Sequence, residues 1–190
     1  MASRSVSDRT ILEKFVEDFV KVLERHAKYM VVSGFVAIAH GRARGTEDID
    51  LIAEKMGRAE FAALFGDLAK SGFECIQSAG AGEAFEYLNE GLSIRFARKG
   101  SFVPEMEFKF AKDALDEYQL AHRKKLPLTG LGVFFSSIEA NIAFKEELLK
   151  SDKDLEDARH LRIIYSGQLD AREISKFKRM IREYRLKGIG

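Results

Sequence analysis

The first candidates for a chemical role are two aspartate pairs with the same spacing, Asp48/Asp50 and Asp152/Asp154. Asp48-Ile-Asp-Leu-Ile-Ala53 alternates in the period-2 manner of a strand, so its two carboxylates point to one face. Carboxylates this close repel each other unless a cation lies between them, and Mg²⁺ takes oxygen ligands. The second pair begins a predicted helix, where residues i and i+2 diverge and acids suit the positive helix end. The first pair therefore predicts a metal site, and the second a solvated helix start.

A serine–glycine turn lies upstream of the first pair. Without it, Asp48 and Asp50 would equally suit a solvated strand end. Gly34 joins the apolar run Tyr29-Met-Val-Val-Ser33 to a short predicted helix over residues 35–40. Backbone N–H groups at such a helix start can bind an anion. An anion site beside a metal site is typical of metal-dependent phosphoryl or nucleotidyl transfer.

The stretch Val31-Val-Ser-Gly-Phe-Val-Ala-Ile-Ala-His-Gly-Arg-Ala-Arg-Gly-Thr-Glu-Asp-Ile-Asp-Leu-Ile52 resembles the signature of the nucleotidyltransferase superfamily. That signature is a hydrophobic strand, Gly-Gly or Gly-Ser, a short helix, and Asp-x-Asp on the next strand. Arg44-x-Thr46 before Asp48 is most similar to a small branch related to abortive-infection toxins and minimal nucleotidyltransferases. Downstream, a helix bearing Lys145 and the run Lys153-Asp-Leu-Glu-Asp157 also resemble that branch. The motifs cover most of 29–165, and the first block is the specific part.

The resemblance implies a third acid on a later strand. Glu105 and Glu107 share a face of the predicted strand 105–110, and we favour Glu107 because Glu105 follows Pro104, where fraying is expected. The expected catalytic and metal-binding residues are Asp48, Asp50 and Glu107, holding Mg²⁺ as two ions, or Mn²⁺. The expected nucleotide-binding residues are Ser33, Gly34, Arg44, Thr46 and Lys145.

Plainer roles stay open for three of these residues. Arg44 could neutralise a triphosphate or could be a solvated loop arginine. Thr46 could support the loop through backbone hydrogen bonds instead of touching substrate. Lys145 precedes Glu146 and Glu147 on an amphipathic helix, which also suits a surface lysine.

The chain departs from the family pattern at two positions. Ser33 stands where the family's turn begins with glycine, so a Cβ lies where close backbone approach is normally wanted. Glu107 stands where the family usually carries aspartate. These departures favour a rival class, a non-catalytic nucleotidyltransferase-like antitoxin or RNA-binding regulatory module.

The element pattern predicts an α/β (α+β) fold, a mixed twisted sheet flanked by helices and followed by a helical C-terminal part. We expect an α/β domain with an N-terminal helix over 1–135 and a helical region over 136–190. Strands are expected near 29–33, 48–53, 73–76, 92–97, 105–110 and 131–135, and residues 78–82 as a glycine-rich connection. Ser136, Ser151 and Asp170 each precede an acid by three residues, which predicts three capped helices after the boundary.

Charge and composition exclude several classes. The formal net charge of the 190 residues is +1, which gives no whole-chain argument for nucleic-acid or membrane binding. Residues 172–187 are nevertheless strongly basic, so this helix could contact a nucleic acid, although a solvated face suits it as well. One cysteine and four scattered histidines predict neither a disulfide nor a zinc site. With no apolar run long enough for a membrane span, we expect a soluble cytoplasmic protein.

These expectations converge on transfer of a nucleoside monophosphate from an NTP such as ATP to a hydroxyl acceptor, with release of pyrophosphate. The acceptor stays open between RNA, a protein hydroxyl and a small molecule, because variable loops build acceptor surfaces. A toxin–antitoxin role follows only from the branch that the motifs resemble. A hydrolase of phosphate esters would share the metal site.

Overall fold

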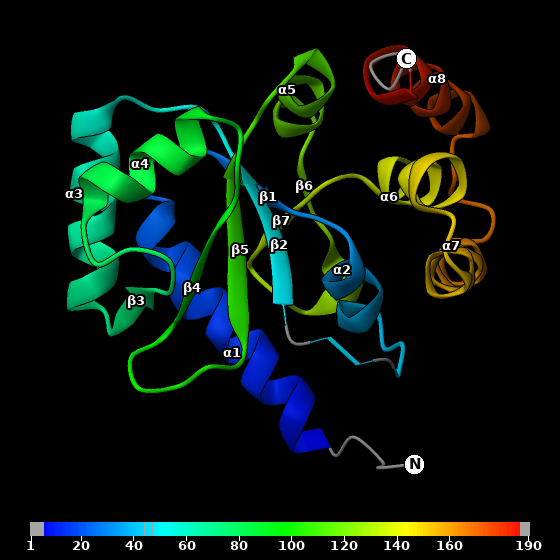
Figure 1. The fold of residues 1–190 in the computed structure, drawn as a ribbon. Helices are drawn as coiled ribbons and strands as arrows, with labels where there is room; N and C mark the ends of the chain where they lie inside the picture. Colours follow the sequence, from blue (N-terminus) through cyan, green and yellow to red (C-terminus); the bar gives the residue numbers. More distant parts are fainter. Residues whose placement is uncertain (1–5, 44, 47, 187–190) are drawn as a thin grey trace.

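The computed structural model describes residues 6–43, 45–46 and 48–186 (Figure 1). The helices are α1 Val6–Leu23, α2 Gly34–Ala39, α3 Arg58–Lys70, α4 Ala81–Asn89, α5 Ala114–Ala121, α6 Ile138–Phe144, α7 Asp152–Ile164 and α8 Ala171–Ile181. The strands are β1 Tyr29–Val31, β2 Asp48–Ala53, β3 Phe73–Cys75, β4 Ile94–Arg98, β5 Glu105–Phe110, β6 Lys124–Lys125 and β7 Phe134–Phe135. One turn of π-helix continues α6 over Lys145–Leu149, and another continues α8 over Arg182–Leu186.

Within the described residues the strands form one seven-stranded sheet in the order β3-β4-β5-β2-β1-β7-β6. The pairs β2/β5 and β1/β7 are parallel, and the other neighbours are antiparallel. Because β2 and β5 lie side by side, both predicted acidic strands occupy the middle of the sheet. The mixed sheet with flanking helices confirms the predicted fold class.

The two faces of the central strands differ in polarity. Along β5, Met106, Phe108 and Phe110 are buried, and the residues between them are half-buried. Phe61 of α3 and Phe85 of α4 both meet Phe110 edge-on, which builds an aromatic core between these helices and the sheet. The opposite face carries the polar residues of β2 and β5 and faces the side on which α5 to α8 lie (Figure 1). The alternation of β5 thus separates the core from the candidate site.

Some elements differ from the sequence expectations. Residues 81 and 82 begin α4 and are not a loose connection; buried Ala84 and Leu88 give this segment an apolar helix face despite its glycines. Strand β6 was not expected from its two lysines. Ser137, not Ser136, caps α6 by accepting a hydrogen bond from the Ala140 N–H. The caps at Ser151 and Asp170 are confirmed.

After β7 every described element is helical. The division of the chain at residue 135 into two domains stays a prediction. None of the described helices combines the length and the apolar character that a membrane crossing requires.

Candidate functional site

Acidic side chains from β2 and β5 meet on the polar face of the sheet. The parallel register sets Asp48 opposite Glu105 and Asp50 opposite Glu107. Asp50 and Glu107 keep 24% and 18% of their side chains exposed, so ligands can reach both. The structure therefore brings together the three predicted acids, Asp48, Asp50 and Glu107, which we call the strand cluster.

The electrostatics of Asp50 reflect this crowding. Burial raises the pKa of the Asp50 carboxyl, and the negative charges of Glu107 and Asp48 raise it further. Lys109 and a hydrogen bond from the Ser33 side chain oppose the rise in this pKa. The net direction is upward, because burial, the largest cause, together with the two acids outweighs Lys109 and Ser33.

Two cations that the sequence analysis did not single out contact the acids. Arg95 lies 3.3 Å from both Glu105 and Glu107, measured from its Nε and a terminal nitrogen respectively. The Lys109 Nζ lies 3.7 Å from Asp50 and 3.8 Å from Glu107. Glu-x-Glu-x-Lys places Lys109 on the face of the acids, which is a signal in the sequence, whereas Arg95 reaches them only through the register of β4 with β5.

The strand cluster has the donor chemistry of a site for a hard divalent cation, since it offers only carboxylate oxygens. In the part of the chain that the structure describes, however, no three His, Cys, Asp or Glu side chains are grouped to hold a metal ion. The carboxylates are spread along two strands and contact Arg95 and Lys109. The residue types fit a metal, and the side-chain arrangement is that of acids paired with cations.

The turn before α2 has an unusual backbone. Ser33 lies at φ 65° and ψ −133°, a region that glycine adopts at little cost and other residues rarely enter. Its side chain does not cap α2 but donates to Asp50. α2 spans six residues and all of them, including Gly34, are buried. The structure thus links the turn to the strand cluster, and the expected contact of Ser33 and Gly34 with phosphate stays a prediction.

The remaining loop residues divide into two cases. The Thr46 Oγ1 donates to the backbone oxygen of Asp48 at 2.8 Å and to its carboxylate at 3.0 Å. This geometry matches the supporting role that was one of its two interpretations. Arg44 lies outside the described residues.

A cavity of about 450 Å³ opens beside the strand cluster. Ser33, Asp50 and Lys109 line it from the sheet, and Asn141 and Lys145 line it from α6 and the π-helical turn. Asp48, Glu107 and Thr46 are not among its lining residues. The cavity therefore joins part of the predicted site to the helical region. A larger cavity of about 700 Å³ elsewhere includes none of the predicted site residues in its lining.

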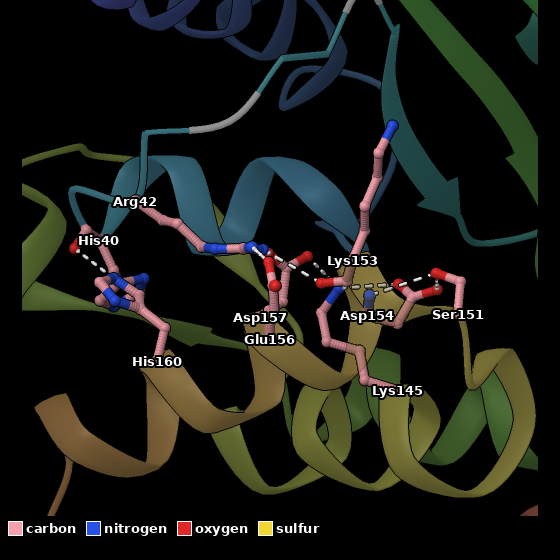
Figure 2. A network of polar contacts seen from close by, with 9 residues as sticks. All are labelled: His40, Arg42, Lys145, Ser151, Lys153, Asp154, Glu156, Asp157 and His160. Atoms are coloured by element: carbon pink, nitrogen blue, oxygen red, sulfur yellow. Dashed lines mark hydrogen bonds and ion pairs between the residues drawn. The ribbon is translucent and has the colours of Figure 1, made fainter.

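Lys145 is buried, so its alternative interpretation as a surface lysine is wrong. Its side chain is 1% exposed, and its Nζ lies 2.8 Å from Asp157 and 3.4 Å from Asp154 (Figure 2). Asp157 itself is 0% exposed. We call Lys145, Asp154 and Asp157 the helix cluster. Its ion pairs direct the lysine charge toward α7, and contact of Lys145 with a nucleotide stays a prediction.

Basic residues of the tail pair with acids of the same chain. Lys178 lies 2.8 Å from Glu146, and Arg182 lies 3.6 Å from Glu147. Arg185 lies 2.7 Å from Asp116, a buried residue of α5 that also lines the cavity. Burial and the charge of Asp113 raise the pKa of Asp116 to about 7, and the charge of Lys109 opposes this rise. The ion pair with Arg185 favours the ionised carboxylate as well. Part of the basic charge of 172–187 is therefore neutralised within the molecule.

Comparison with known proteins tests the resemblance. No family model and no curated protein matches this sequence. The solution structure of the antibiotic-resistance factor ANT(2'')-Ia is similar at a TM-score of 0.55 and 15% identity, over 95% of this chain and 96% of that one. An antigenic nucleotidyltransferase-like protein from Paracoccidioides brasiliensis gives 0.52 and 17%, over 98% and 92%.

A crystal structure of ANT(2'')-Ia in complex with adenylyl-2''-tobramycin gives a TM-score of 0.50 and 17% identity, over 94% of this chain and 98% of that one. At these identities the likeness concerns the fold alone. The agreement extends over nearly the whole of each chain. The chain therefore has the nucleotidyltransferase-like fold that its sequence motifs imply.

Proposed function

We propose that this protein is a metal-dependent nucleotidyltransferase that transfers a nucleoside monophosphate from an NTP to a hydroxyl acceptor. The observation that carries the proposal is the register of β2 with β5, which sets Asp50 opposite Glu107 on the face beside the cavity. The nucleotidyltransferase-like fold supports it.

In this proposal Asp48, Asp50 and Glu107 hold Mg²⁺ as two ions, or Mn²⁺, which supplies positive charge to the phosphate oxygens and lowers the pKa of the acceptor hydroxyl. The hydroxyl oxygen bonds to the α-phosphorus, the bond to the pyrophosphate oxygen breaks, and the hydroxyl proton passes to a carboxylate of the strand cluster. Lys109 exchanges its contact with Asp50 for one with a phosphate. Ser33, Gly34 and Lys145 bind the nucleotide, together with Arg44 and Thr46 on the loop.

Isothermal titration with an NTP and Mg²⁺ tests the donor site. Wild type binds, and the double variant Asp48→Ala/Asp50→Ala loses at least about a hundredfold in affinity, because the ion between protein and phosphates has lost its ligands. Asp152→Ala is the matched control, since it removes an exposed acid from the other Asp-x-Asp motif. Equal binding by wild type and the double variant would contradict the proposal.

The acceptor is tested by incubating the protein with α-labelled NTP and, separately, cellular RNA, cellular protein and a panel of hydroxylated antibiotics. Label on one of these classes names the acceptor. Tight RNA binding without labelling supports the non-catalytic module instead, and release of unattached nucleotide supports a hydrolase. Lys178, Arg182 and Arg185 already pair with acids of this chain, so their charges do not favour the RNA-binding module over the enzyme.

A further inference from the structure

The segment that follows α2 is tied to α7 through Arg42 (Figure 2). The Arg42 guanidinium donates to the backbone oxygen of Lys153 at 3.1 Å and forms ion pairs with Glu156 and Asp157. The Arg42 side chain is 15% exposed. One planar guanidinium thus contacts acceptors of three residues within little more than one turn at the start of α7, an arrangement that lysine could not reproduce.

A second contact holds the same end of α2. The His160 ring of α7 lies 3.1 Å from the backbone oxygen of His40, and the His40 ring lies 2.7 Å from the Tyr165 hydroxyl. His40 also contacts the Val36 oxygen through its other ring nitrogen. The end of α2 is therefore fixed to α7 on both sides of Gly41.

The segment that begins at Arg42 continues into β2, which carries two acids of the strand cluster. The chain runs from Arg42 through Thr46, which donates to Asp48, into β2. At the other end of α2, Ser33 donates to Asp50. Asp157, which receives Arg42, also holds Lys145 beside the cavity. Arg42 is thus a contact between the helical region and the residues that lead to Asp48.

We propose that Arg42 is a positioning residue for nucleotidyl transfer: by fixing the chain just after α2 to α7, it sets the place of Asp48 in the strand cluster. The inference rests on the proposed function, since Asp48 needs a defined position only if it holds a ligand there. A purely structural ion pair between α7 and the loop would affect stability without a specific effect on β2.

The experiment compares Arg42→Ala, Arg42→Lys and a matched control, Arg162→Ala. Arg162 also lies on α7, but its partner is Glu146, 2.7 Å away, and not the α2 segment. Two readouts are taken: kcat and KM with labelled NTP, and hydrogen exchange of the backbone amides over 41–50. Arg42→Ala lowers kcat at least about tenfold with a smaller change in KM, because supports of site ligands typically contribute that much. Its amides over 41–50 exchange faster.

Arg42→Lys recovers part of kcat, because the charge remains while the forked geometry is lost. Arg162→Ala keeps kcat within about twofold and leaves exchange over 41–50 unchanged. If Arg42→Ala does not fold, Arg42→Lys is compared with Arg162→Ala instead, and the expected changes in kcat and amide exchange are smaller. Equal exchange over 41–50 in the Arg42 variants and the control overturns the inference. A wild type without transferase activity refutes the proposed function, and the exchange readout then decides separately whether Arg42 fixes the segment before Asp48.

Discussion

The strand cluster and the helix cluster both bring carboxylates together, yet their charges are balanced differently. Asp50 and Glu107 are partly exposed, and their cations lie at 3.3 to 3.8 Å. Asp157 is 0% exposed and lies 2.8 Å from a lysine that is itself buried. A buried, matched pair belongs to the structure, whereas accessible acids that repel one another leave a position for a ligand.

The largest effect that separates the two clusters is expected at Asp157. Asp157→Asn removes the charge between Lys145 and Arg42 and leaves the buried Lys145 without full compensation. We expect a loss of about 3–5 kcal/mol in the free energy of unfolding, measured by urea denaturation. Asp152→Asn, which changes an exposed acid on the same helix, should cost less than about 1 kcal/mol. Equal losses would show that Asp157 is no more structural than a surface acid.

Asp116 combines features of both clusters, because it is buried and paired with Arg185 while its pKa is raised to about 7. A carboxyl with a raised folded pKa contributes stability that is complete below its unfolded pKa of 3.8 and is lost as pH rises through about 7. The free energy of unfolding of wild type should therefore fall by about 1–2 kcal/mol relative to Asp116→Asn between pH 5 and pH 8. The raised pKa alone would give a larger fall, which the ion pair with Arg185 reduces.

The measurement for Asp116 is urea unfolding of wild type and variant at several pH values across that window. Glu117→Gln, an exposed neighbour on α5, is the control and should show no such pH-dependent difference. A constant difference between wild type and Asp116→Asn would mean that Arg185 keeps Asp116 ionised throughout.

Ser33 tests whether strain accompanies the strand cluster. Ser33→Gly and Ser33→Ala both remove the hydrogen bond to Asp50, but glycine alone accepts the positive φ without cost. We expect Ser33→Gly to be about 1 kcal/mol more stable than Ser33→Ala in thermal unfolding. Equal stability of the two variants would show that the turn relaxes to ordinary backbone when the serine hydroxyl is lost.

The sequence predicts the parts of this molecule that depend on local pattern. Strand alternation located β2 and β5 and set Asp48, Asp50 and Glu107 on shared faces, because side-chain direction in a strand follows from parity alone. The nucleotidyltransferase resemblance predicted the fold. By contrast, α4 was missed because Gly80 and Gly82 at its start outweighed an apolar face that only tertiary packing reveals.

Long-range pairing accounts for what was missed at the candidate site. Arg95 reaches Glu107 only because β4 and β5 pair in one register among several that the hairpin could adopt. Lys145 is followed by two glutamates, which predict a solvated helix face, and its burial depends on Asp157 of the next helix. Arg42 contacts residues more than a hundred positions away, and no local signal indicates that pairing.

The two clusters are distinguished most directly by the sign of a single neutralising change. At Asp157 the fold supplies cations that the carboxylate must match, so Asp157→Asn destabilises. At Asp50 burial and the charges of Glu107 and Asp48 raise the pKa of the carboxyl, so the folded protein disfavours the ionised form of Asp50. Asp50→Asn should therefore leave the protein as stable or more stable by up to about 1 kcal/mol at neutral pH, measured by urea unfolding without divalent ions. Destabilisation like that of Asp157→Asn would mean that Lys109 fully compensates the charge of Asp50. The strand cluster would then be a second structural ion-pair network, without the excess negative charge that attracts a cation.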